Sequence, residues 1–204
     1  MVEIIQIDEY CPSFQDISML WREMCNGKIL AIPTHSGYSL VLLPENRSGI
    51  KSLQKLFSKE KKLPVAIYKD VSYMAKDFMV SQSVFKLLKK NSPSSCTFII
   101  AAAPAVSAKI IYERRAEIGI KFPDEPLLTE LLKLSYPKPL VSFGLVESDS
   151  DEFAILPHEL SEKISLQDLV IVDYDRPVIV KPSTIVDCCK WPASIIRQGD
   201  FCLQ

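Results

Sequence analysis

Residues 28–43, KILAIPTHSGYSLVLL, decide the fold class of this chain. Two apolar runs, residues 28–33 and 38–44, have the length and the β-branched content of buried strands. The polar segment THSG at residues 34–37 separates them and reads as a turn. Because parallel neighbours need a long crossover, so short a link predicts that these two strands pair antiparallel.

Outward from this hairpin, strands alternate with helices. An amphipathic helix is expected over residues 13–27, ending at Gly27, and Asn46 is a candidate N-cap for a basic helix that runs through Phe57. Further strands are expected at residues 2–7, 63–69, 96–103, 117–123 and 139–145, and further helices within residues 72–90 and at about 124–134. The pattern predicts a single α/β domain over residues 1–204, with a mixed sheet and helical cover.

Length and composition exclude several classes of protein. With 204 residues, of which 48% are apolar, the chain can bury a substantial core. No apolar run has the length of a membrane span, and the first residues lack the layout of a signal peptide, so we expect a cytoplasmic protein without a membrane partner. The six cysteines show no C-x-x-C spacing and lie far from both histidines, His35 and His158. We therefore expect reduced thiols and no permanently bound metal.

The net charge of −1 conceals an uneven distribution of charge along the chain. Residues 51–121 contain 14 Lys and Arg but only 5 Asp and Glu, a local balance of +9 (14 minus 5). Gathered on one face, these residues would attract phosphates or RNA. The alternative is that they are the solvated faces of ordinary helices.

The common signatures of nucleotide, zinc and serine-hydrolase sites are absent from the sequence. It contains no G-x-G-x-x-G, no G-x-x-x-x-G-K-[ST], no H-E-x-x-H and no G-x-S-x-G. Covalent catalysis therefore has no evident nucleophile. Small hydroxyl and cationic residues do follow several expected strands, which is where α/β folds usually place their ligand-binding groups.

Five stretches carry a family resemblance. PTHSGYSL at residues 33–40 resembles the P-T-D-[ST]-x-Y-[GA]-L signature of the YrdC-like family. The further stretches, in the order of that family, are SPSSCT (92–97), IGIKFP (118–123), KPSTIVD (181–187) and SIIRQG (194–199). The resemblance covers nearly the whole chain and is strongest to the YciO branch. It implies a YrdC-like α/β fold, a twisted, mixed, open sheet with helices and a concave ligand-binding face.

The resemblance also implies a function. Synthases of this family make L-threonylcarbamoyladenylate from threonine, bicarbonate and ATP, for the threonylcarbamoylation of adenosine in tRNA. The implied ligands are ATP or AMP with Mg²⁺ and L-threonine, and the implied partner is tRNA or double-stranded RNA. The residues expected to bind nucleotide or substrate are Thr34, Ser36, Tyr38, Lys59, Lys62, Thr97, Lys121, Ser142, Ser183 and Arg197. His35 occupies the aspartate position of the first signature. The sequence shows no partner for it, so we expect a solvent-exposed loop residue and no general base.

The sequence departs from the synthase pattern at several positions. The expected K-x-R falls in residues 56–62, LFSKEKK, which contain no arginine, and Lys121 replaces another arginine. Residues 94–95 are Ser-Ser instead of Gly-Pro, and the expected S-x-N coincides with Gly144 and Val146, which have no side-chain hydrogen-bonding group. We therefore expect reduced or altered synthase-like activity and leave open whether the chain is an enzyme. The alternative is a non-catalytic RNA-binding module, in which the hydroxyls near residues 34–36 only stabilise a turn.

Overall fold

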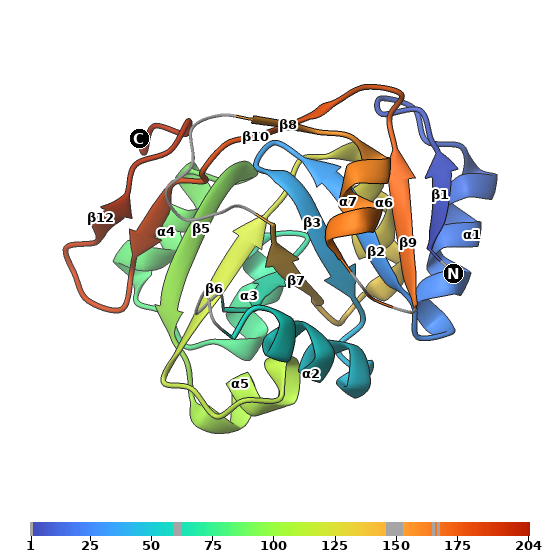
Figure 1. Ribbon diagram of the computed structural model, residues 1–204. Coiled ribbons are helices and arrows are strands. Elements are labelled where there is room, and N and C mark those ends of the chain that lie inside the picture. Colours follow the sequence, from blue (N-terminus) through green and yellow to red (C-terminus); the bar gives the residue numbers. More distant parts are fainter. Residues whose placement is uncertain (1, 59–62, 146–152, 165, 167) are drawn as a thin grey trace.

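The computed structural model describes residues 2–58, 63–145, 153–164, 166 and 168–204 (Figure 1). The strands are β1 (Glu3–Gln6), β2 (Ile29–Thr34), β3 (Gly37–Leu42), β4 (Val65–Ile67), β5 (Ser94–Ala101), β6 (Glu117–Phe122), β7 (Leu140–Gly144), β8 (Phe153–Ile155), β9 (Leu169–Asp173), β10 (Val178–Val180), β11 (Ile185–Asp187) and β12 (Ser194–Arg197). The helices are α1 (Phe14–Cys25), α2 (Arg47–Leu56), α3 (Val71–Asp77), α4 (Gln82–Lys90), α5 (Pro104–Ile111), α6 (Pro126–Ser135) and α7 (Pro157–Lys163).

Ten strands form one mixed sheet, in the order β1-β9-β2-β3-β7-β4-β6-β5-β11-β12. β1 and the N-terminus lie at one end of this sheet and β12 at the other (Figure 1). The predicted hairpin is confirmed, because β2 and β3 pair antiparallel from Leu30↔Val41 to Thr34↔Gly37. Parallel pairs such as β4 with β6 occur beside antiparallel ones such as β4 with β7, so the predicted mixed α/β sheet is also confirmed.

Local signals in the sequence set the starts of several helices. Ser13 caps α1, accepting from the backbone N–H of Asp16, whose carboxylate in turn accepts from the backbone N–H of Ser13. Asn46 caps α2 as predicted, since its side-chain oxygen accepts from the N–H of Gly49 at 2.8 Å. Each such cap satisfies an N–H that the helix itself leaves unpaired, and is usually worth about 1 kcal/mol.

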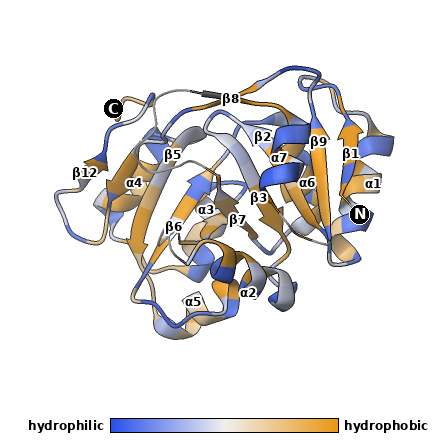
Figure 2. Ribbon diagram, viewed as in Figure 1, coloured by the Kyte–Doolittle hydropathy of each residue, from blue (hydrophilic) through white to orange (hydrophobic). Residues whose placement is uncertain are grey.

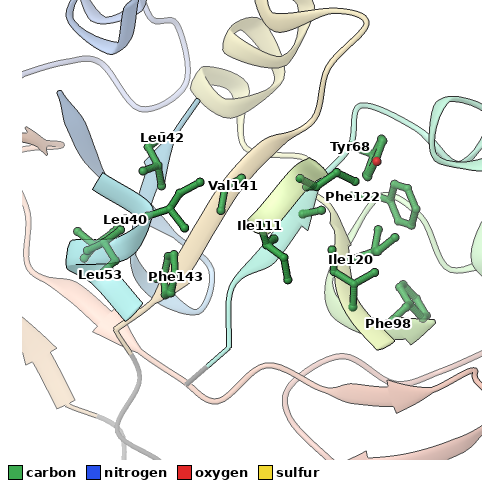
Figure 3. Packing of buried hydrophobic residues seen from close by; sticks show 14 of the residues in the cluster. Leu40, Leu42, Leu53, Tyr68, Phe98, Ile111, Ile120, Phe122, Val141 and Phe143 are labelled. Atoms are coloured by element: carbon green, nitrogen blue, oxygen red, sulfur yellow. The ribbon is translucent and has the colours of Figure 1, made fainter. Parts of the chain in front are cut away.

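Alternate residues along the strands pack into two separate hydrophobic clusters on opposite faces of the sheet. Leu40 and Phe143 belong to the larger cluster, with Leu53 of α2 and Ile111 of α5 (Figure 3). Side chains from α3, α4 and α7 also belong to it. Ile32 and Val41 belong to the smaller one, with side chains from α1 and α6. In Figure 2 a buried strand such as β9 is largely orange, whereas α2 alternates between blue and orange along its length.

The smaller cluster covers only part of its face. Helix α6 buries four leucines against β2, β3 and the ends of β4 and β7, and each fully buried leucine contributes about 1.5–3 kcal/mol to stability. By the strand registers Val41, Ser142, Val65 and Gly119 share this face, in neighbouring strands. On β4, β6, β5 and β11, side chains of this same face line a cavity, which Gly144 of β7 also borders.

The described part of the basic stretch of residues 51–121 does not gather on that open face. Its helices, α2 to α5, bury apolar residues such as Leu53 and Leu88 in the larger cluster, on the opposite face of the sheet. Of its basic residues that the structure describes, Arg115 and Lys121 line the cavity. The interpretation as solvated helix faces therefore accounts for most of the described lysines.

Two further findings bear on the class of protein. All six cysteines are free, and Cys96 and Cys188 are buried. Within the described residues, no helix is both long and apolar enough to cross a membrane.

Candidate functional site

A cavity of about 350 Å³ lies on the open half of the sheet. Ligand cavities typically measure about 300–1,000 Å³, so this one can hold a small molecule. Of the ten residues predicted to bind nucleotide or substrate, seven line it: Thr34, Ser36, Tyr38, Thr97, Lys121, Ser183 and Arg197. Residues separated by more than 160 positions in the sequence thus meet at one place, because β2, β3, β5, β6 and β12 belong to the same sheet.

The turn between β2 and β3 supplies two of these hydroxyls. Thr34 Oγ1 donates to the carbonyl of Gly37 at 2.7 Å and accepts from the N–H of Ser36 at 3.3 Å. Gly37 has φ +99°, and a Cβ there would lie 3.1 Å from a methyl group of Val180, so the position requires glycine. Thr34 therefore does stabilise a turn, and the same turn presents Ser36 to the cavity.

The C-terminal strands build the opposite wall. Arg197 Nε donates to the carbonyl of Ser183 at 2.9 Å, and its Nη2 lies 3.2 Å from Ser183 Oγ. Ser183 Oγ is in turn 3.5 Å from Thr97 Oγ1. The guanidinium is thus held in a fixed orientation at the cavity, with N–H groups left over for a ligand.

Lys121 and Arg197 are cations in an environment that disfavours charge. Burial lowers the pKa of Lys121, the positive charge of Arg197 lowers it further, and Glu125 partly opposes both effects. Burial also lowers the pKa of Arg197. A bound anion would compensate this desolvation, since an opposite charge stabilises the charged form. The electrostatics of the cavity therefore favour a phosphate or carboxylate ligand.

Two predicted residues, Tyr38 and Ser142, use their hydroxyls in contacts within the fold. The hydroxyl of the buried Tyr38 donates to the carbonyl of Val172 at 3.2 Å, so this phenol supports the fold. Ser142 is buried and its hydroxyl pairs with that of Ser39, which does line the cavity. Lys59 and Lys62 lie outside the described residues.

The sequence analysis missed other residues of the cavity. Arg115 and Glu117 line one end of it, and Gly144 borders it at the end of β7. A Cβ added at Gly144 would meet no atom within 4 Å, so the position where synthases carry a polar side chain is open space here. Val146, the other half of that missing motif, lies outside the described residues.

A second cavity of about 480 Å³ adjoins the first and shares Thr34, Ser36 and Ser183 with it. It also contains His35, which is exposed as predicted but does have partners. His35 Nδ1 lies 3.0 Å from Glu125 Oε1, and its backbone N–H donates to the same oxygen at 3.1 Å. Hydrogen bonding to Glu125 raises the pKa of His35. This partner is not evident from the sequence, because Glu125 is 90 residues away from His35.

Comparison with known proteins agrees with this geometry. The family model Sua5_yciO_yrdC, described as telomere recombination, matches residues 22–199. The chain belongs to the Sua5/YciO/YrdC family. Within it, YciO of Escherichia coli K12, a protein named as uncharacterized, is 26% identical over 179 residues, or 85% of this chain and 84% of YciO. The crystal structure of E. coli YciO superposes with a TM-score of 0.79 at 23% identity, covering 98% of this chain and 96% of that one.

Two other members connect the Sua5/YciO/YrdC family to a small-molecule substrate. A Methanocaldococcus jannaschii protein provisionally named threonylcarbamoyl-AMP synthase is 24% identical over 191 residues, 92% of this chain and 87% of that protein. The crystal structure of P. abyssi Sua5 complexed with L-threonine has a TM-score of 0.76 at 16% identity, covering 98% of this chain and 57% of Sua5. The fold is therefore that of the Sua5 and YciO proteins.

Proposed function

We propose that the first cavity binds an adenine nucleotide or adenylate, with threonylcarbamoyl-AMP as the ligand class. The observation that carries this proposal is the presence of two partly desolvated cations, Lys121 and Arg197, beside the hydroxyls of Ser36, Thr97 and Ser183. Cations at such sites bind phosphate by charge-assisted hydrogen bonds, which are roughly twice as strong as neutral ones. The threonine complex of Sua5 supports L-threonine as a second ligand.

The chemistry of this ligand class fits a site without a nucleophile. The carbamate formed from threonine and carbon dioxide would attack the α-phosphorus of ATP, so that a carbamate O–P bond forms and pyrophosphate leaves. The protein has only to align the reactants and neutralise negative charge, and Lys121 and Arg197 can do the latter. Mg²⁺ would arrive with the nucleotide and neutralise its phosphates.

Turnover is expected to be slow even where binding is good. Gly144 stands where synthases of this family carry a polar side chain, and it offers no donor for the transition state. Losing one such donor typically lowers kcat by about 10²–10³-fold. The proposal is therefore a protein that retains the nucleotide site of the family with reduced or altered synthase activity.

A tRNA or double-stranded RNA partner is the second candidate. One observation favours it: Leu63 and Pro64 line the cavity, and the lysines of residues 59–62 directly precede them in the chain. Phosphates of an RNA held there would lie near the nucleotide site. In the threonylcarbamoylation that the family resemblance implies, the adenylate donates its group to tRNA, so both candidates concern the same pathway of tRNA modification.

Ligand binding by the purified chain tests the proposal. Thermal shift assays with ATP, AMP, L-threonine and threonylcarbamoyl-AMP should show stabilisation by the nucleotides, because a ligand of the folded state raises its Tm. In isothermal titration, Lys121→Ala should weaken nucleotide binding by about 1.5–3 kcal/mol, or about 10- to 150-fold. Lys121→Arg should bind at least as well as the wild type.

The matched control is Lys51→Ala, which removes an exposed lysine from α2 and should leave the affinity unchanged. Equal nucleotide affinity in Lys121→Ala and the wild type would contradict the proposal.

A further inference from the structure

The second cavity contains three metal-ligating side chains in close proximity. His35 Nδ1 lies 3.0 Å from Glu125 Oε1 and 3.5 Å from Asp124 Oδ1, and the three ligand atoms lie within 4.8 Å of one another. Two ligand atoms bound to one tetrahedral ion, at metal distances of about 2.1 Å, are about 3.4 Å apart. The observed spacings bracket this value, so one ion could contact all three atoms after small side-chain adjustments.

The surrounding structure fixes two of these residues in place. The turn that carries His35 is closed by the hydrogen bond from Thr34 to Gly37, and the backbone N–H of His35 donates to Glu125. Glu125 immediately precedes α6, whose leucines anchor it to the sheet, and its side chain is only 12% exposed. The side chains of His35 and Asp124 are 58% and 48% exposed, so an ion has access from solvent.

The cluster places two carboxylates beside one imidazole. Two other cations of the cavity lie beside carboxylates of their own: Arg176 contacts Glu9 at 2.6 Å, and Lys181 contacts Asp200 at 3.3 Å. Among the described residues, His35 is the cationic side chain within ion-pair distance of Asp124 and Glu125, and the charge of Lys121 also acts on Glu125. A protonated imidazole supplies one positive charge for two carboxylates, whereas a divalent cation supplies two.

A second, independent feature of the same cavity is a buried polar atom without a partner. The hydroxyl oxygen of Tyr174 is buried and has no hydrogen-bond partner among the described residues. Burial and the charge of Glu125 both raise the pKa of this phenol, so it stays protonated and needs an acceptor. A buried hydroxyl without a partner is costly, and water or an anion held in this cavity would satisfy it.

We propose that His35, Asp124 and Glu125 form a binding site for one divalent transition-metal ion, such as Zn²⁺ or Mn²⁺, that opens into the second cavity. Imidazole nitrogen suits Zn²⁺ and other first-row transition ions, while Mg²⁺ prefers oxygen ligands alone. Three protein ligands leave at least one coordination position for water or a ligand group. The first cavity shares three residues with this one, so the ion would lie beside the nucleotide site.

This site is separate from the proposed function and from any Mg²⁺ that accompanies ATP. It depends on the histidine that replaces aspartate in the first family signature, together with a carboxylate pair 89 and 90 residues further along the chain. Metal binding by the ligand-free chain would stand even if nucleotide binding failed, and the reverse also holds. The two proposals can therefore fail independently.

Isothermal titration of the full chain with ZnCl₂, MnCl₂ and MgCl₂, without nucleotide, tests the site. We expect one ion per chain for Zn²⁺ and Mn²⁺, with Zn²⁺ tighter, and binding of Mg²⁺ at least tenfold weaker than that of Mn²⁺. Asp124→Asn removes the carboxylate that lies outside the turn contacts, and should weaken Zn²⁺ and Mn²⁺ at least tenfold. Mn²⁺ matters as a probe because, unlike Zn²⁺, it has little affinity for the chain's free thiols.

His35→Asp gives the sharpest discrimination, since an all-oxygen site should lose most of its preference for Zn²⁺ over Mg²⁺. His158→Ala, which removes the other histidine, is the matched control and should bind like the wild type. Circular dichroism and Tm would verify that each variant is folded. If Mn²⁺ does not bind, or binds equally to wild type and Asp124→Asn, the cluster is only an ion pair that fastens the β2–β3 turn to α6.

Discussion

Replacing Lys121 with methionine should make the ligand-free protein more stable while weakening the nucleotide binding that we propose. In the folded chain the pKa of Lys121 lies below its usual value of 10.5, because burial and the nearby Arg197 disfavour the charged form. Methionine retains an unbranched apolar side chain and removes that charge. Replacing a buried ion pair or triad by apolar residues is often neutral or stabilising by about 1–4 kcal/mol, and we expect the same direction for this single charge. For a chain of this size, each 1 kcal/mol raises Tm by about 2–4 °C.

The stability difference between the wild type and Lys121→Met should depend on pH, and the direction of this dependence tests the prediction. Because the folded pKa is below 10.5, the unfolded wild type holds this proton more tightly, and its unfolding free energy rises as the pH approaches 10.5. The variant lacks this titration. Its advantage in Tm should therefore be largest near neutral pH and shrink toward pH 10.5.

Differential scanning calorimetry of wild type and Lys121→Met from pH 7 to about 10 measures this difference. The matched control is Lys51→Met, an exposed lysine of α2, whose Tm should follow the wild type at every pH. Because the control shares all other titrating groups, it cancels their effects. A Lys121→Met variant that is less stable than the wild type at pH 7 would refute the claim that this charge is held at a cost for binding an anion.

Three further predictions concern turnover, the fold and RNA. With threonine, bicarbonate and MgATP, the wild type should release pyrophosphate at least about 10²-fold more slowly than a full-motif synthase. Gly144→Ser meets no steric barrier, so this variant should fold normally and release pyrophosphate faster than the wild type. A wild-type rate equal to that of such a synthase would contradict the prediction. Tyr38→Phe should cost about 0.5–1.5 kcal/mol in urea unfolding, because it removes the hydrogen bond to Val172, and leave nucleotide affinity in titration unchanged. If duplex RNA binds, fluorescence anisotropy over a salt series should show a steep slope, and glutamine at the three lysines of residues 59–62 should reduce it by about one unit for each phosphate that is no longer neutralised. An unchanged slope would show that those lysines do not contact the RNA phosphates.

Most of the fold could be predicted because its elements carry local signals. The strands flanking the THSG turn and the cap of α2 at Asn46 follow from hydrophobic runs and from one side chain that binds its own backbone. Helix α5 (Pro104–Ile111) was not predicted. It follows β5 through the apolar run AAA, and its N-cap, Ala103, makes no side-chain hydrogen bond. Pro104 at its first turn was the one available signal.

The site was predictable only where a family signature marked it. Signatures identified Lys121, Ser183 and Arg197, yet they could not tell which way Tyr38 points, because that depends on which face of β3 is covered. The cluster of His35, Asp124 and Glu125 could not be predicted from the sequence, for a different reason. Its carboxylates come from the segment before α6 and meet the β2–β3 turn only after the sheet has formed. The hydrophobic periodicity of a single sequence does not reveal such a contact between distant segments.

The side chains present in the first cavity determine whether it should favour binding or turnover. Its cations act on ligand charge in the ground state, so Lys121 and Arg197 favour affinity whether or not a reaction follows. Catalysis needs additional interactions that form only in the transition state, and at the end of β7 this chain has Gly144 and open space. A site that retains its cations but lacks this donor should bind the adenylate more effectively than it makes it. Nucleotide affinity that depends on Lys121, combined with slow pyrophosphate release, would therefore indicate a protein that holds or uses threonylcarbamoyl-AMP, and not one whose main role is its synthesis.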